Sequence, residues 1–191
     1  MNSVKAVVIF LSLLFVSSVF AQSFKPGSDP TGFRNIKWGT ELVTFPGMEF
    51  YKTATPGGSY PVGEWDSARE VYLDIYLRIE DKLRIEGTEV KRIDYGFWKG
   101  KLCEVTITTK GFENWASLKK GILRRFGKGK VVRFPSYGLL GFEGLGETQW
   151  HVWLGKITEM ELLYDGSSQI GELWMGSTVL REQLFKEEQK Q

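Results

Sequence analysis

Two stretches of the chain align without gaps: FWKGKLCEVTI at residues 97–107 and VWLGKITEMEL at residues 152–162. Both follow the pattern W-x-G-K-[LI]-x-E-[VM]-x-[IL], in which apolar and polar residues alternate after a glycine. Such alternation is typical of β-strands, and a glycine between two strands is typical of a tight turn. We therefore predict two related β-hairpins, and a repeated unit of this kind is the strongest indication of the fold.

The pairing register follows from the requirement that apolar residues gather on one face of each hairpin. A three-residue loop at 98–100, with Gly100 in the left-handed conformation, places Tyr95 opposite Cys103. The same loop at 153–155 gives an apolar face in the second copy that carries Trp150, Val152, Met160, Leu162 and Tyr164. The opposite face carries Asp94, Glu104, Thr106, Gln149, His151, Glu159 and Glu161. One packed and one solvated face are common in antiparallel sheets.

Three segments outside the repeat also have a clear period. Residues 71–79 alternate apolar and polar side chains, which predicts a strand. Residues 114–126 have a helical period and end before Gly127, a typical helix terminator. The apolar face of this helix consists of Trp115, Leu118, Ile122 and Phe126. Ser177 is a suitable cap for a C-terminal helix over residues 177–191.

These elements predict a two-layer α+β fold. An antiparallel sheet is built from two related helix-plus-meander units, about 33–110 and 111–176, with the helices packed on one face. We expect residues 22–191 to form a single domain, because that length buries a core without help from disulfides or metal.

The first 21 residues have the pattern of a cleavable signal peptide. Lys5 precedes an apolar run over 6–20, and Ala21 ends the segment. An uncleaved membrane anchor is the alternative, but the run is shorter than the ~20 apolar residues that span a bilayer. Gln22 stands where a lipoprotein would have cysteine. We predict a periplasmic or secreted protein without stable membrane insertion, whose residues 22–32 form a mobile lead-in.

Composition excludes several classes of site. The chain has one cysteine, Cys103, and one histidine, His151, so neither an internal disulfide nor a zinc site rich in these residues can form. Basic side chains exceed acidic ones only slightly, 25 against 23, which argues against a nucleic-acid partner. The basic helix flank formed by Lys119, Lys120 and Arg124 is better explained as a solvated surface than as a lipid or acidic-partner site.

Catalytic signatures are missing from the sequence. In the predicted register Cys103 is a buried, inert thiol that does not meet His151. His151 with the nearby Glu159 could carry out acid–base chemistry, but carboxylates of this spacing are typical of any solvated sheet face. We predict no catalytic residues, no metal and no cofactor.

Trp98 and Trp153 occupy equivalent positions at the predicted hairpin tips. Aromatic residues at such positions either cover the core or anchor a partner, and aromatics are frequent among interface hot spots. The predicted binding residues are Trp98, Trp153, His151, Glu104 and Glu159.

Two resemblances accompany this pattern. The layout of two helix-plus-meander units resembles β-lactamase-inhibitor proteins and small outer-membrane-assembly lipoproteins. Over about the first two-thirds of the mature chain, three motifs look like a group of uncharacterised exported bacterial proteins: Phe33-Arg34-x-Ile36-x-Trp38-Gly39-Thr40, Tyr76-x-Arg78-x-x-Asp81-x-Leu83-x-Ile85 and Tyr95-x-Phe97-x-x-Gly100-x-Leu102. Both resemblances imply a bacterial envelope protein, and neither implies an activity.

The expected function is a non-enzymatic module that binds another envelope protein through the polar sheet face and the hairpin tips. The first alternative is a small-molecule or lipid carrier with an apolar pocket between helix and sheet, lined by Trp115, Ile122, Trp150 and Met160. The second alternative is an enzyme of unrecognised type, which would require His151 in a cleft beside a perturbed carboxylate.

Overall fold

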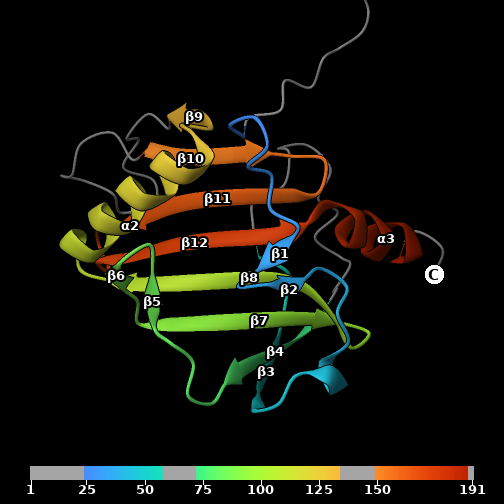
Figure 1. The fold of residues 1–191 in the computed structure, drawn as a ribbon. Helices are drawn as coiled ribbons and strands as arrows, with labels where there is room; N and C mark the ends of the chain where they lie inside the picture. Colours follow the sequence, from blue (N-terminus) through green and yellow to red (C-terminus); the bar gives the residue numbers. More distant parts are fainter. Residues whose placement is uncertain (1–23, 58–71, 134–148, 189–191) are drawn as a thin grey trace, which may run out of the picture.

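A single eight-stranded antiparallel sheet dominates the structure (Figure 1). The computed structural model describes residues 24–57, 72–133 and 149–188, so the predicted signal peptide lies outside the described residues. The strand order is β3-β4-β7-β8-β12-β11-β10-β9. The strands are β3 (Met48–Ala54), β4 (Leu73–Arg78), β7 (Arg92–Trp98), β8 (Lys101–Lys110), β9 (Lys130–Arg133), β10 (Gln149–Leu154), β11 (Thr158–Asp165) and β12 (Ile170–Ser177).

The sheet is built in two halves, each of which starts at one edge and ends at the centre. Strands β3, β4, β7 and β8 run from the first edge to the centre, and helix α2 (Phe112–Phe126) carries the chain to β9 at the far edge. Strands β10 and β11 then lead back to β12, which pairs with β8. Short elements complete the fold: β1 (Gly32–Phe33), β2 (Ile36–Lys37), the 3-10 helix η2 (Leu42–Thr44), β5 (Arg84–Ile85), β6 (Thr88–Glu89) and α3 (Thr178–Glu188).

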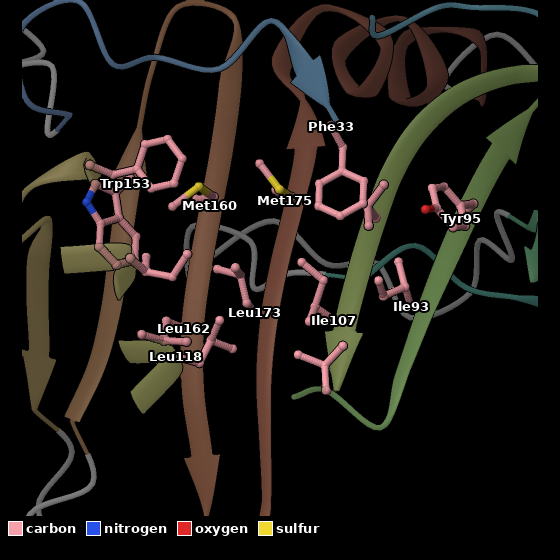
Figure 2. Close-up of a cluster of buried hydrophobic side chains, with 14 of the residues drawn as sticks. Phe33, Ile93, Tyr95, Ile107, Leu118, Trp153, Met160, Leu162, Leu173 and Met175 are labelled. Carbon is pink, nitrogen blue, oxygen red and sulfur yellow. The ribbon is translucent and has the colours of Figure 1, made fainter. Parts of the chain in front are cut away.

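Helix α2 contributes to the main hydrophobic core. It buries the side chains predicted from its period, Trp115, Leu118, Ile122 and Phe126, and it ends at Gly127. Leu118, Ile122 and Phe126 belong to one cluster with residues of five sheet strands (Figure 2). Ile93, Tyr95, Ile107, Trp153, Met160, Leu162 and Leu173 are sheet members of this cluster. The face of the sheet that these side chains occupy is called the core face below.

Helix α3 belongs to the opposite face, contrary to the prediction that the helices share one face. Its Leu184 is buried in a second cluster with Leu73 and Ile75 of β4. Ile75 pairs with Gly96, the neighbour of the core residue Tyr95, and successive strand residues point to opposite faces. The helix cap at Ser177 forms as predicted, since its hydroxyl accepts a hydrogen bond from the Leu180 N–H at 3.3 Å.

The first hairpin has a shorter turn than predicted. Trp98 pairs with Lys101, so only Lys99 and Gly100 form the turn, both with positive φ. These angles are those of a type I′ turn, and Gly100 adopts them without a steric cost. A register shift then leaves Cys103 without an opposite residue and places Tyr95 opposite Val105 rather than Cys103. Tyr95 stays on the core face because the total shift is two residues.

The pairing register of the second hairpin is shifted from the predicted register by an odd number of residues. Each side chain of β10 therefore lies on the opposite face of the sheet from the one predicted. Trp153 pairs with Met160 and His151 pairs with Leu162. Trp153 and His151 therefore lie on the core face, while Trp150 and Val152 lie on the other face. The predicted apolar face of this strand is wrong, because both of its faces carry large side chains and the sequence pattern alone did not distinguish them.

The predicted mobile lead-in is also wrong for residues 24–32. Phe24 is buried against Phe126, with ring centroids 6.0 Å apart. The Asp29 carboxylate accepts hydrogen bonds from the backbone N–H groups of Lys156, Ile157 and Thr158 at 2.9–3.1 Å. Residues 24–37, here called the N-terminal segment, thus cross the core face as part of the folded domain (Figure 1). Among the described residues, no helix is both long and apolar enough to cross a membrane.

Candidate functional site

Two of the predicted binding residues lie inside the core. Trp153 is 0 % exposed, and its indole Nε1 donates a hydrogen bond to the Gly127 carbonyl at 3.2 Å. His151 is buried and stacks on Trp153, with ring centroids 5.9 Å apart. Burial lowers the pKa of the His151 imidazole, while the Lys128 carbonyl contacts its Nδ1. Neither side chain is accessible to a partner, and the predicted tip position of Trp153 is wrong.

Trp98 lies at the end of β7 beside the turn, and its side chain is partly buried. It packs against the second cluster, which contains Leu73, Ile75 and Leu184. The Lys99 ammonium lies 4.8 Å from the centre of the Trp98 ring and also pairs with Glu187 of α3. These contacts explain Trp98 as part of the junction between the first hairpin and α3.

Glu104 and Glu159 meet at one residue, Arg181 of α3. The Arg181 guanidinium lies 3.8 Å from the Glu104 carboxylate and 3.7 Å from the Glu159 carboxylate. It also stacks over the Trp174 ring, with its Cζ atom 4.2 Å from the ring centre. Arg181 and Glu104 are each 3 % exposed, so this ion pair is buried.

The backbone of Gly57 completes this cluster. The Gly57 N–H donates to both Glu104 carboxylate oxygens, at 3.0 and 3.1 Å, and the Gly57 carbonyl accepts from Arg181 at 2.8 Å. A Cβ atom on Gly57 would lie 2.5 Å from the Trp174 ring, so the backbone approaches only because this residue is glycine. Burial raises the pKa of Glu104 despite these donors. The cluster joins α3, the sheet and residue 57.

Cys103 lies beside this cluster and is buried. Burial, with the adjacent Glu104 carboxylate, raises the pKa of the Cys103 thiol to about 12. A thiol with a raised pKa is a poor nucleophile at neutral pH, as the sequence analysis expected. Strands β12 and β11 separate β8, which carries Cys103, from β10, which carries His151. In the part of the chain that the structure describes, no group of three or more His, Cys, Asp or Glu side chains could hold a metal.

A cavity of about 870 Å³ opens on the core face, and none of the five predicted residues lines it. Its walls are the N-terminal segment over residues 27–37, the β5–β6 hairpin and α2. Its floor is apolar and comes from Ile107, Leu173 and Met175 of the sheet. The floor is almost completely covered, since Ile107 is 0 % and Leu173 is 1 % exposed. A molecule in the cavity would therefore meet mainly the polar walls.

Arg34 fixes two of these walls relative to each other. It lies in the β1–β2 turn, where Arg34 and Asn35 both have positive φ. Its guanidinium pairs with Asp81 and donates to the Lys82 carbonyl and, at 3.0 Å, to the Arg84 carbonyl. Asp81 also accepts a hydrogen bond from the buried Tyr95 hydroxyl at 2.7 Å. This network connects the N-terminal segment through residues 81–84 to the sheet.

The charged residues that line the cavity are predominantly basic: Arg34, Lys37, Arg84 and Arg125 against Asp29 and Glu86. Arg125 pairs with Glu86 at 2.8 Å, and Asp29 is held by three backbone N–H groups. Within the described residues, Lys37 and Arg84 have no ion pair, and both are exposed. Two lining cations, Lys37 and Arg84, are thus left without an ion pair against one lining carboxylate, Asp29, and the lining carries an excess of positive charge.

A smaller hollow of about 390 Å³ adjoins this wall. Arg34 and Arg84 line both hollows. Around the smaller one, the remaining charged residues are Arg78, Glu80, Asp81 and Lys82. Basic side chains thus continue from the cavity wall onto the outer surface of the 78–84 loop.

The cavity lies between helix and sheet, as the carrier alternative predicted, but its walls differ from the predicted ones. Of the four residues predicted to line it, Ile122 does so, and Trp115, Trp150 and Met160 are not among the lining residues. The N-terminal segment and the β5–β6 hairpin were missed because their contacts join residues far apart in the chain. Two signals were available: the two-residue turns at Arg34-Asn35 and Glu86-Gly87 connect short strands, and each turn carries a charged residue.

Comparison of the chain with protein-family models, with curated proteins and with solved structures gives no match. The two resemblances stay predictions, and the geometry of the molecule is the basis for a functional proposal.

Proposed function

We propose that this protein binds a small molecule in the 870 Å³ cavity between the N-terminal segment, the β5–β6 hairpin and α2. The observation that carries the proposal is the cavity itself. Its volume falls within the ~300–1,000 Å³ typical of ligand sites, and polar side chains from several separate segments converge on it. The covered floor favours a compact polar ligand over a long lipid chain, because Ile107 and Leu173 expose almost no surface.

Construction of the walls supports this proposal. Asp29 anchors the N-terminal segment to the backbone of residues 156–158, and Arg34 anchors it to the 81–84 loop. Both anchors are charge-assisted, which makes their hydrogen bonds stronger than neutral ones. Walls held in this way keep the cavity open without a ligand, and preformed sites lose less entropy on binding.

The expected protein-binding role has less support. Trp153 and His151 are in the core, and Glu104 is used by Arg181 and Gly57. Of the five residues on which that role rested, Trp98 and Glu159 keep partial access to solvent. We therefore rank protein binding second.

Export is part of the proposed function. Residues 1–21 have the pattern of a signal peptide, which supports a binding site in the periplasm or outside the cell. Amino-terminal sequencing of the protein recovered from the periplasm tests this, and a chain that keeps Met1 would contradict it.

A thermal-shift screen against small molecules tests the binding site. A ligand that binds only the folded state raises the melting temperature by mass action. Thr31 is exposed and lines the cavity, so Thr31→Trp should introduce a large ring that obstructs it. Thr53 is exposed on the edge strand β3, and Thr53→Trp is the matched control. The proposal predicts a shift that Thr31→Trp abolishes and Thr53→Trp retains. Shifts that are equal in both variants would contradict it.

A further inference from the structure

We infer that the ligand carries an anionic group, a carboxylate or a phosphate, which is bound by Arg84 and Lys37 from two walls of the cavity. This inference rests on the proposed function and adds the chemical class of the ligand. It comes from the distribution of charges around the two hollows and from the partners that those charges already have.

Two acidic residues near these cations already have cationic partners of their own. Asp81 pairs with Arg34, and Glu86 pairs with Arg125 and, at 3.6 Å, with Arg124. Asp29 has its charge stabilised by three N–H donors rather than by a cation. Glu89 lies opposite Arg84 in the β5–β6 pairing, but the two side chains form no ion pair, and no described acidic side chain pairs with Lys37.

The basic residues are arranged differently. Arg84 donates one hydrogen bond, from Nε to the Gly87 carbonyl at 3.0 Å, and within the described residues the outer edge of its guanidinium makes no further hydrogen bond or ion pair. Lys37 lies on β2 in the N-terminal segment, lines the same cavity from another wall, and has no acidic partner among the described residues. Arg78 and Lys82 extend the positive surface around the adjoining hollow, where Glu80 is the only acidic side chain that Arg34 does not neutralise.

Such a wall selects for anions. A guanidinium presents parallel N–H donors that match the oxygen spacing of a carboxylate or a phosphate. A cleft lined by one sign of charge with low-dielectric walls also raises the local concentration of the opposite charge. The cavity volume of about 870 Å³ leaves room for a small ring or a short chain behind the anionic group. A neutral ligand would leave Arg84 and Lys37 without a counter-charge and would gain nothing from them.

Three probes with the same ring separate the alternatives: 2-naphthol, 2-naphthoate and 2-naphthyl phosphate, which are respectively neutral, a carboxylate and a phosphate. Each is titrated into the full mature chain at pH 7 and low ionic strength, with ring fluorescence as the readout. Arg84→Gln and Lys37→Gln remove the proposed anion contacts. Lys52→Gln on β3 is the matched control, because Lys52 is an exposed cation that does not line the cavity.

The inference predicts that at least one anionic probe binds about tenfold more tightly than naphthol, since charge-assisted hydrogen bonds are the strong ones. Arg84→Gln should remove most of that difference, Lys37→Gln part of it, and Lys52→Gln none. The better of the two anionic probes identifies the headgroup as carboxylate or phosphate.

Two results would overturn the inference in distinguishable ways. Equal affinity for all three probes would mean that the cavity binds small molecules but does not prefer anionic ones. Failure of all three to bind, with unchanged fluorescence in the wild type and in Thr31→Trp, would overturn the proposed function together with this inference. A preference for the anionic probes that persists in both glutamine variants would place the anion elsewhere.

Discussion

Trp153 is the largest of the completely buried side chains, and it illustrates how the core is held together at the residue scale. Its ring contacts the core cluster, stacks on His151 and donates a hydrogen bond to the carbonyl that follows α2. We predict that Trp153→Ala lowers the free energy of unfolding by about 3–5 kcal/mol, the usual cost of a large buried aromatic. Urea denaturation measures this.

Trp98→Ala is the matched control for that prediction, because it deletes the same side chain at a partly buried position. Its effect should be clearly smaller. Equal and small losses in the two variants would mean that Trp153 is exposed, and this would contradict the observed register of β10.

His151 gives the protein a predictable dependence on pH. Burial lowers the pKa of its imidazole, so the folded state resists a proton that the unfolded chain accepts below its ordinary pKa of about 6.5. Its contribution to stability is therefore complete above about pH 6.5 and is lost as the pH falls towards the lowered pKa of the folded state.

We predict that the wild type loses more free energy of unfolding between pH 7.5 and 5 than His151→Gln, which does not titrate there. Chemical denaturation at several pH values gives both curves, and other titrating groups cancel in their difference. A difference between the two proteins that does not change with pH would show that the pKa of His151 is not lowered.

At the element scale, the N-terminal segment depends on Asp29. Its carboxylate accepts three backbone hydrogen bonds at the turn between β10 and β11. We predict that Asp29→Ala costs about 1.5–3 kcal/mol of stability, the range for hydrogen bonds to charged groups. Hydrogen exchange should become faster at residues 24–37 and 156–158 and stay unchanged in β8.

Ser28→Ala is the control for this prediction. Ser28 is adjacent in sequence, but its hydroxyl donates only to the Lys25 carbonyl within the same exposed turn. Equal exchange rates in the two variants would contradict the role of Asp29 as the anchor.

The elements themselves were largely predictable from sequence, and their pairing was not. The periods of residues 71–79 and 114–126 identified β4 and α2 because each pattern depends on neighbouring residues alone. The hairpin registers depend on loop length, which the repeated motif suggested to be equal in the two copies. It is not, because Lys99-Gly100 is a two-residue turn whereas Gly155, Lys156 and Ile157 separate β10 from β11.

The N-terminal segment was mispredicted for a related reason. Its glycines and prolines are typical of a flexible lead-in, and composition contains no information about distant contacts. Phe24 and Asp29 fold it onto residues about one hundred positions away or more. The cavity could not be predicted for the same reason. Its walls are formed by segments that are far apart in the chain, and no local sequence pattern marks such walls.

At the scale of the whole molecule, the sheet supports two different regions. On the core face, the N-terminal segment and α2 enclose a cavity with a positive wall. On the other face, α3 is fixed by the buried contact of Arg181 with Glu104 and Trp174. A buried ion pair of this kind is costly to break from one side, which suits a rigid structural junction rather than an exchangeable binding surface.

Binding of a small molecule in the cavity on the core face can be tested by native mass spectrometry of the mature protein, isolated without denaturation from the organism that makes it. We predict a discrete small-molecule adduct on the wild type and on Thr53→Trp, and its absence from Thr31→Trp. A wild-type protein that carries no adduct, even after incubation with the small-molecule extract of the same cells, would show that the cavity is not a binding site.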